Sequence, residues 1–377
     1  MKPRSNSQNH SLPQETQIAC DCCRDMHETR KMPRRDFLTA AGGAVLGASA
    51  LGGVLPVARV LAQVNPTGLA IKSALENQAK SPESLVKVLY ETLSPKQREE
   101  ICFAWDYQDP TRGLLRTRVA NNWEITKQMI KSDFYTNDQR AIIRGIFEGI
   151  ISPEWHQRID KQLGDDSGGY GTHNSIAIFG TPGSDKFEFV MTGRHMTIRC
   201  DGNSADHVAF GGPIFYGHAA QGFNEKATHP GNVFWPQAQA ANKLYDMLDK
   251  HQQEQALLRE GLPDESHVAF QGKKGKFQGL AVTDLSSDQR EHLQKVVAML
   301  VEPYRQSDRD EVTQCLKSQG GLDACHLAYY AQQDIGKDKV WDIWRLEGPS
   351  FVWHYRGAPH VHVWVNVADD PGVKLNA

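Results

Sequence analysis

The residues best suited to chemistry lie near the C-terminus, in segment 351–367, which predicts two short strands joined by a turn at 356–359. After the turn, His360 and His362 stand two residues apart in a run where histidine, tryptophan and asparagine alternate with valine. Because side chains in a strand alternate between its two faces, both imidazoles point to the same face. Imidazole binds zinc, copper and iron, so this face predicts part of a transition-metal site.

A third histidine of this segment, His354, joins that face in only one of two hairpin registers. A loop of residues 356–359 pairs Tyr355 with His360 and turns His354 away from His362. A loop of residues 357–359 places His354 directly across from His362 and makes it a ligand. The sequence leaves both registers open.

The elements that position these residues belong to a chain of 377 residues with a net charge of −3. This length is enough for a substantial core in one large domain or two coupled ones. Beyond the N-terminus, no basic stretch resembles a nucleic-acid footprint, so nucleic-acid binding is excluded from the expected functions.

The N-terminal 62 residues have the features of an export signal. Arg34 and Arg35 precede a weakly hydrophobic run rich in Ala and Gly, which ends near a small-x-small site at Ala62. These features predict a twin-arginine signal peptide, with the twin-arginine translocase as partner and a periplasmic or extracellular location. A membrane anchor is the alternative reading. Cleavage at Ala62 leaves no stable membrane span and a single domain of residues 63–377.

Seven cysteines are divided between these two parts. Three lie upstream of the paired arginines and leave with the signal. Cys102, Cys200, Cys315 and Cys325 remain, and four cysteines in an oxidising compartment allow three pairings. Cys315 and Cys325 flank two glycines, so a local disulfide between them is one candidate.

Helical and strand patterns alternate in blocks along the mature chain, in the order helices, strands, helices, strands. Helices are expected over 82–103 and 136–163, then over 238–259, 286–306, 310–317 and 327–332. Strands are expected over 175–180, 186–193, 195–200, 340–346 and 351–367, with a further strand or a loop over 208–216. The order predicts an α+β fold: an antiparallel sheet of middle and C-terminal strands, packed with helices of the N-terminal and 238–332 regions.

Three of the expected helices start with the same capping chemistry. Ser94, Thr136 and Ser286 are each followed three residues later by glutamine, the pattern of a capping box. These motifs are too short to establish a repeated architecture.

Several blocks together resemble a family known as domain of unknown function 3500. In chain order they contain Asp138-Gln139-Arg140, Phe179-Gly180-Thr181-Pro182, Gly193-Arg194-His195-Met196, Glu347-Gly348-Pro349 and His360-Val361-His362. The similarity extends from about residue 93 to residue 371. Members often carry a Gly-His-His-Leu block, in which Arg194 here replaces the first histidine. They also often carry an acid at the position of His354, and an arginine before the Asp-Pro pair at 370–371.

The resemblance implies that His195 joins His360 and His362 on one face of the sheet. A fourth metal position is then either open to water or filled by His218, His229 or Glu225 from glycine-rich loops. Three protein ligands with an open position are typical of catalytic sites, whereas four ligands are typical of structural sites.

Two functions follow from this pattern. The first is a metal-dependent exported enzyme acting on an unknown small molecule, with zinc, copper or iron as cofactor. The second is a non-catalytic exported protein that binds a metal or a small ligand with the same histidines. A purely structural envelope protein would instead leave the histidines dispersed. No Gly-x-Ser-x-Gly elbow, phosphate loop or dinucleotide motif occurs in a suitable context.

Overall fold

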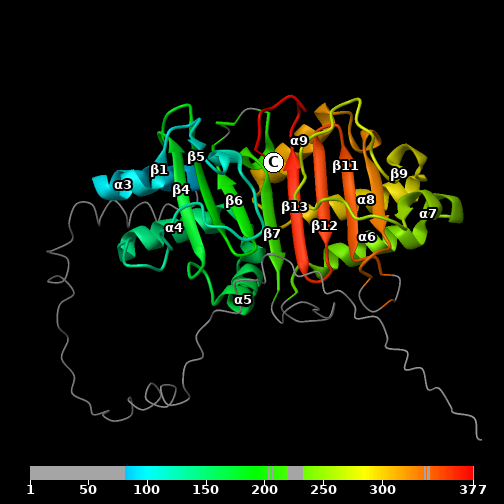
Figure 1. The fold of residues 1–377 in the computed structure, drawn as a ribbon, viewed down its shortest axis with the longest axis horizontal. Helices are drawn as coiled ribbons and strands as arrows, with labels where there is room; N and C mark the ends of the chain where they lie inside the picture. Colours follow the sequence, from blue (N-terminus) through cyan, green and yellow to red (C-terminus); the bar gives the residue numbers. More distant parts are fainter. Residues whose placement is uncertain are drawn as a thin grey trace, which may run out of the picture. The chain divides into compact units, whose positions relative to one another are not determined.

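A computed structural model describes residues 81–376 except 203, 206, 220–231, 335–336 and 338–339. Its principal element is a mostly antiparallel sheet with the strand order β1-β4-β5-β6-β7-β13-β12-β11-β10-β8, and β9 also pairs with β10. Figure 1 shows these strands side by side. Only the outer pairs β1–β4 and β10–β8 are parallel. The predicted α+β class is therefore confirmed.

The first half of the described chain contributes one side of this sheet. Its helices are α2 (Pro82–Thr92), α3 (Pro95–Ile101), α4 (Asn137–Ile150) and α5 (His156–Ser167). Its sheet strands are β1 (Cys102–Phe103), β4 (Asn174–Gly180), β5 (Phe187–Gly193), β6 (Met196–Cys200) and β7 (Ile214–His218). A separate small hairpin joins β2 (Gln108–Asp109) to β3 (Gly113–Leu114).

The second half contributes the other side. Its helices are α6 (Trp235–Met247), α7 (Lys250–Ala256), α8 (Ser287–Val301) and α9 (Gln306–Ser318). Its strands are β8 (Leu257–Leu258), β9 (Leu280–Ala281), β10 (His326–Tyr330), β11 (Ile343–Gly348), β12 (Phe351–Arg356) and β13 (Val361–Val367). None of the helices in the described residues is both long and apolar enough to cross a membrane.

The two halves repeat one arrangement around the β7–β13 pair. In each half a short strand follows two helices and pairs in parallel with the first strand of a four-strand antiparallel run, β4 to β7 or β10 to β13. The last strands of the two runs, β7 and β13, are antiparallel neighbours at the centre of the sheet. The described chain therefore contains an internal structural repeat, which the capping motifs alone did not establish.

The capping glutamines take part in this repeat. In the first half, the side chains of Gln97 and Gln139 donate to each other's amide oxygen at 2.8 and 3.1 Å. In the second half, Gln252 and Gln289 form the same reciprocal pair at 3.0 and 2.9 Å. Each glutamine also completes the capping box of its own helix. The capping glutamines therefore link the start of α3 to that of α4, and the start of α7 to that of α8, by buried hydrogen bonds.

The helices pack on one face of the sheet and extended segments cover the other. Buried residues of all the major helices share one hydrophobic cluster with residues of the long strands. On the opposite face, residues from 103–125 pack on β4 and β5, and Val268 packs with Phe215, Val352 and Trp364. Both faces are buried, so histidines on either face lie inside the protein.

A buried ion cluster lies on this second face. Glu188 of β5 accepts from Arg116 at 2.7 Å and from Arg199 of β6 at 3.1 Å. Arg199 also donates to the carbonyls of Pro213 and Arg118, so each of its three nitrogens has a partner.

Two expectations about this fold were wrong. Residues 327–332 were expected to be helical, but His326–Tyr330 form strand β10, paired with β11, because the pairing buries Leu327 and Tyr329 among the helices. The local disulfide is also absent: Cys315 and Cys325, like Cys102 and Cys200, are free thiols. The expected domain boundary at residue 62 lies outside the described residues and stays a prediction.

Candidate metal centre

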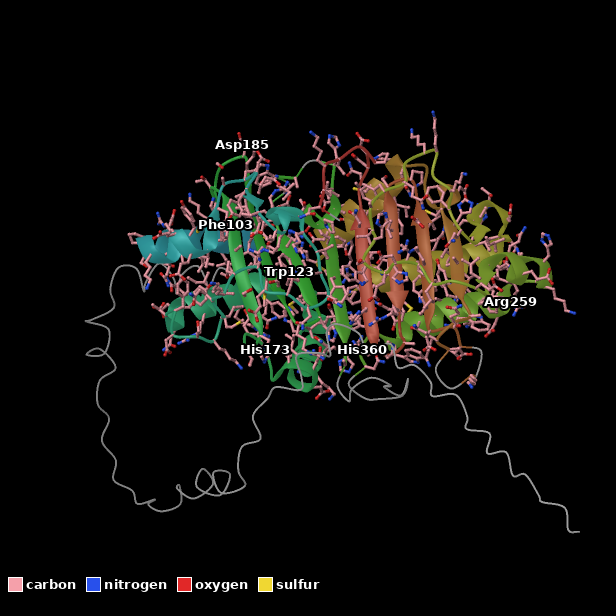
Figure 2. All side chains as sticks on the ribbon, viewed as in Figure 1. Phe103, Trp123, His173, Asp185, Arg259 and His360 are labelled. Carbon is pink, nitrogen blue, oxygen red and sulfur yellow. The ribbon has the colours of Figure 1, made fainter. Side chains whose placement is uncertain are left out.

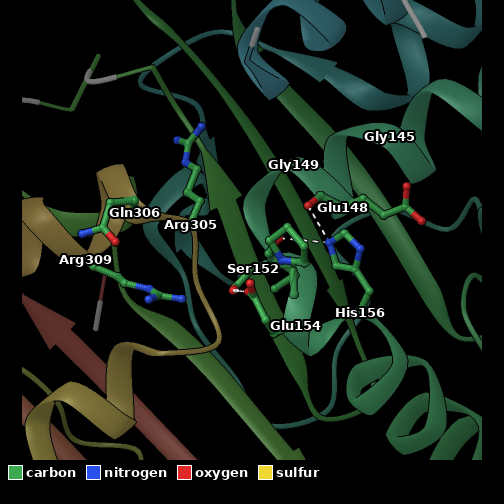
Figure 3. A pocket seen from close by; sticks show the side chains of 11 residues that line it. Gly145, Glu148, Gly149, Ser152, Glu154, His156, Arg305, Gln306 and Arg309 are labelled. Atoms are coloured by element: carbon green, nitrogen blue, oxygen red, sulfur yellow. Dashed lines mark hydrogen bonds between the residues drawn. The ribbon is translucent and has the colours of Figure 1, made fainter. Parts of the chain in front are cut away.

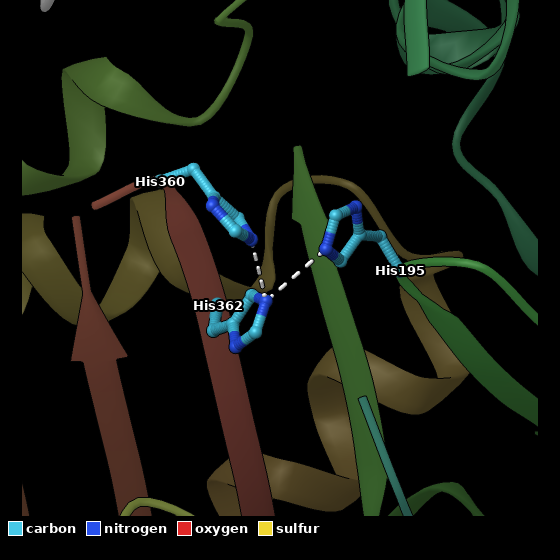
Figure 4. A group of neighbouring side chains, drawn as sticks. All are labelled: His195, His360 and His362. Atoms are coloured by element: carbon cyan, nitrogen blue, oxygen red, sulfur yellow. Dashed lines mark hydrogen bonds between the residues drawn. The ribbon is translucent and has the colours of Figure 1, made fainter. Parts of the chain in front are cut away.

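Three histidines from two distant parts of the chain meet near one end of the sheet. His195 lies in the two-residue turn between β5 and β6, His360 directly precedes β13, and His362 is the second residue of β13. Figure 2 shows His360 at the end of the sheet opposite Asp185, and Figure 4 shows the three side chains together. At most 1% of each histidine is exposed.

The turn that carries His195 is held in an unusual conformation. His195 has a φ of 54°, a left-handed conformation that residues with a side chain adopt rarely. The neighbouring segment supports it, because His195 N donates to the carbonyl of Asn121 at 3.1 Å and Arg194 forms a bridge with Asn122. The chain thus retains backbone strain at a buried histidine, a feature often found at functional sites.

A glycine lets His195 reach His362. Strand β7 lies between β6 and β13, and in this pairing Gly217 is directly opposite His362. A Cβ atom on Gly217 would lie 2.3 Å from the carbonyl oxygen of Val361 and 3.3 Å from His195 Cδ2. The missing side chain therefore leaves the space above β7 in which the imidazoles of His195 and His362 meet.

The three imidazoles converge through their Nε2 atoms. His362 Nε2 lies 3.1 Å from His195 Nε2 and 2.9 Å from His360 Nε2 (Figure 4). One nitrogen of each ring can be chosen so that all three lie within 4.8 Å of one another. His362 is thus the central member of the group.

Asp166 orients His195 from the C-terminal turn of α5. Its Oδ2 contacts His195 Nδ1, and its Oδ1 accepts from Arg194 Nε at 3.0 Å. Burial opposes ionisation of Asp166, but the nearby charges and hydrogen bonds outweigh it and hold the pKa of this carboxyl below its usual range. An ionised Asp166 accepts the Nδ1 proton of His195 and leaves the Nε2 lone pair directed at the cluster.

Glu265 plays the matching part at His362. Its Oε1 lies 3.4 Å from His362 Nδ1 and 3.1 Å from Arg356 Nη1. Two chains of the same kind, arginine to carboxylate to histidine, therefore approach the cluster from different segments. Each fixes the ring nitrogen that faces away from the cluster, a common arrangement around metal-binding histidines.

The histidines are held in the neutral form that binds metal. Burial is the largest cause that lowers the pKa of all three, and the positive charge of Arg356 acts in the same direction. The pKa of His360 falls to about 2, and that of His362 falls well below its ordinary value. For His195, burial outweighs the opposing charge of Asp166. Neutral imidazoles need no deprotonation before they bind a cation.

Two of the three nitrogen separations fit a shared ion. An ion about 2.0–2.1 Å from two imidazole nitrogens, at angles between octahedral and tetrahedral, places them about 2.9–3.4 Å apart. The separations of His362 Nε2 from its two neighbours, 3.1 and 2.9 Å, lie in this range. Three nitrogen ligands suit zinc, copper or iron, and within the part of the chain that the structure describes they leave further coordination positions.

The other candidate histidines are not part of this group. His218 is the last residue of β7. Like Tyr216, which packs among the helices, it points to the face of the sheet opposite to that of His362. His354 is on the face of His362, but its Nδ1 accepts from Arg345 Nε at 3.4 Å. His229 and Glu225 lie outside the described residues.

The hairpin register explains the position of His354. Arg356 pairs with His362, and His354 pairs with Trp364. Neither expected register is correct, because the connection spans residues 357–360, one residue beyond the predicted turn. His354 keeps the face required of a ligand but lies two residues further along the strand, next to Arg345 of β11.

Sequence reasoning missed four residues of the site. Asp166 lies at the end of a helix and Glu265 in a loop, and no local pattern connects them to the histidines. Arg356 was read as part of the turn or as the last strand residue before it, and not as a group of the site. Gly217 stood within a glycine-rich block, where a glycine opposite a histidine becomes visible only once the β7–β13 register is known.

A pocket of about 480 Å³ lies away from the histidines, beside the N-terminus of α9. Figure 3 shows its polar side chains engaged with the protein itself: His156 Nε2 contacts the carbonyls of Glu148 and Ile151, and Ser152 donates to Glu154. Arg305 pairs with Glu83 and Asp308. The pocket therefore offers few polar groups for a ligand, and the histidine cluster is the better candidate site.

No curated protein and no solved structure matches the chain. A family model matches residues 76–367, more than half of the chain and the whole of the segment that carries the three histidines. The chain accordingly belongs to the family described as protein of unknown function DUF3500.

Proposed function

We propose that this protein is an exported metal-dependent enzyme, with a transition metal bound by His195, His360 and His362. The observation that carries the proposal is the convergence of three buried imidazoles at His362 Nε2, two of them oriented by carboxylates. Without an ion, this arrangement is unfavourable. Adjacent Nε2 lone pairs repel unless one nitrogen carries a proton, and that proton can bridge only one pair at a time.

The ion would be zinc, copper or iron, and it would polarise a bound oxygen or activate a water molecule. The protein supplies three neutral ligands, and Arg194 and Arg356 balance the charges of Asp166 and Glu265. Within the described residues the three ligands themselves carry no negative charge, so the ion's own charge would be available to attract a substrate. Hydrolysis and redox chemistry both use such centres.

Export by the twin-arginine route fits this proposal, since that route carries proteins folded in the cytoplasm, many of them with their metal already loaded. Arg34 and Arg35 support it, and the mature protein would act in the periplasm or outside the cell. Replacement of both arginines by lysine should retain the protein in the cytoplasm in cell fractionation. Unchanged export of that variant would contradict this part of the proposal.

Metal content tests the centre itself. Protein purified after its own export should contain about one transition-metal ion per chain by elemental analysis, and His360→Ala should lose most of it. Exported protein without stoichiometric metal would contradict the proposal.

The alternative is a non-catalytic metal-binding protein, favoured by the nearly complete burial of all three histidines. Cobalt-substituted protein separates the two readings. Azide should change its visible spectrum if a coordination position is open, as an enzyme requires. An unchanged spectrum would favour the non-catalytic protein.

A further inference from the structure

We propose that the ligand of this metal centre carries an oxyanion, a carboxylate or a phosphate, and that Arg356 binds this group through its Nε–Nη2 edge. The inference rests on the proposed metal centre and adds the chemical class of its ligand. It stands on the position, the hydrogen bonding and the exposure of Arg356.

Arg356 is the last residue of β12 and lies directly opposite His362 in the β12–β13 pairing. Residues paired in this way point to the same face with their Cβ atoms about 4.5–5.5 Å apart. Its guanidinium is joined to the centre by Glu265, whose Oε1 lies 3.1 Å from Arg356 Nη1 and 3.4 Å from His362 Nδ1. A group held by Arg356 therefore lies beside a metal ligand.

One edge of this guanidinium is unused. Among the described residues, Arg356 Nε and Nη2 are buried and have no hydrogen-bond partner, whereas Nη1 is bound to Glu265. Three other arginines (Arg98, Arg116 and Arg118) each leave only Nε unpaired in this way. Buried donors without partners are costly, and they call for an acceptor that binds between them.

The geometry of that edge selects the acceptor. Nε–H and one Nη2–H of a guanidinium point in parallel, and a carboxylate or phosphate accepts both with two oxygens. The fully bonded Arg199 shows the contrast, since Glu188 and backbone carbonyls occupy its donors and make it structural. Nε and Nη2 of Arg356 have no such partner among the described residues, and they can bind a ligand.

Exposure indicates the direction of approach. The side chains of Arg356 and Glu265 are 11% and 24% exposed, while that of His362 is completely buried. A ligand that enters from solvent thus meets the arginine and the glutamate before the histidines. The positive charge of an ion held by three neutral histidines also favours an anion at this place.

Titration calorimetry on the metal-loaded protein tests the inference, with acetate, malonate and inorganic phosphate as probes. Malonate offers one carboxylate to the ion and one to Arg356, so it should bind more tightly than acetate. Arg356→Lys keeps a charge for Glu265 but lacks the fork, and it should weaken malonate or phosphate about 10- to 100-fold. Arg290→Lys, whose arginine pairs with Asp323 outside the site, should bind like the wild type.

The outcomes separate this inference from the metal centre. Equal anion affinity in the wild type and Arg356→Lys, with metal content unchanged, overturns the role of Arg356 but leaves the centre intact. If the metal-loaded wild-type protein binds none of the anions, the role of Arg356 is likewise overturned and the metal centre is unaffected. A wild-type protein that binds no metal overturns both proposals. Whichever of malonate and phosphate binds more tightly identifies the class of oxyanion.

A second measurement covers the case in which Arg356→Lys loses its metal or fails to fold. Phenylglyoxal modifies accessible arginines in the wild-type protein, and peptide mass spectrometry locates the modification. The tighter anion should protect Arg356 at least several-fold and leave Arg290 unprotected. Equal modification of Arg356 with and without the anion would contradict the proposal.

Discussion

Gly217 lies directly opposite His362 in the pairing of β7 with β13, and this pairing makes room for the site. His195 and His362 belong to segments separated by a whole strand, yet their Nε2 atoms are 3.1 Å apart. They meet because the strand between them carries no side chain at that point.

Gly217→Ala should therefore weaken the metal centre and the fold together. The new Cβ would lie 2.3 Å from the Val361 carbonyl, so β7 and β13 must separate, at a cost of about 1–3 kcal/mol in the free energy of unfolding. Urea unfolding and metal titration of the same variant measure both effects. Gly164→Ala is the control, because nothing lies within 4 Å of its Cβ and alanine favours a helix, so its stability should not fall.

Asp166→Asn should lower metal affinity about 10- to 100-fold, because the amide no longer provides the charged acceptor that orients His195. Competition with a chelator of known affinity measures the change. The adjacent Asp165 pairs with Lys161 at the surface, so Asp165→Asn should leave the affinity unchanged. Equal effects of the two substitutions would contradict the assigned role of Asp166.

Glu188→Gln should destabilise the protein by about 3–5 kcal/mol, since it leaves the buried charges of Arg116 and Arg199 without their partner. Urea unfolding gives the value directly. Glu291→Gln removes an exposed pair with Lys295 and should change stability by less than about 1 kcal/mol. A small effect at Glu188 would indicate that the cluster is not the buried ion network described.

Stability should decline between about pH 4.3 and pH 7 through Glu311. Burial raises the pKa of Glu311 to about 7, against about 4.3 in the unfolded chain. In that interval the folded state holds a proton that the unfolded state releases, so stability present at low pH is lost as the pH rises. Glu311→Gln should reduce this decline in thermal unfolding and leave the part due to Asp308, whose pKa burial raises to about 6, whereas substitution of the exposed Asp310 by asparagine should preserve it.

The sequence predicted part of the site for a clear reason. Side chains of a strand alternate, so His360 and His362 had to share a face whatever the rest of the fold was. The approach of His195 was inferred only from the family resemblance. Asp166, Glu265 and Gly217 were missed because their roles depend on contacts between separate segments, 29 residues apart for Asp166 and His195 and 97 for Glu265 and His362, which no local pattern encodes.

The fold was predictable to a similar extent. Capping boxes marked the starts of α3, α4 and α8 correctly, since capping is a local interaction. Strand β10 was taken for a helix because all but the first of its residues are buried, which removes the alternation that distinguishes a strand. The register of the β12–β13 hairpin also depends on the pairing of β13 with β7. Residues 351–367 alone do not reveal that pairing.

The most direct test is a metal titration of metal-free protein, comparing the wild type with His362→Ala and His354→Ala. His354 is also buried on a strand of the same face but lies outside the cluster. The wild type and His354→Ala should each bind about one equivalent of a transition-metal ion tightly, and His362→Ala should lose that site. Equal binding by all three proteins, or no tight site in the wild type, would contradict a metal centre built on His195, His360 and His362.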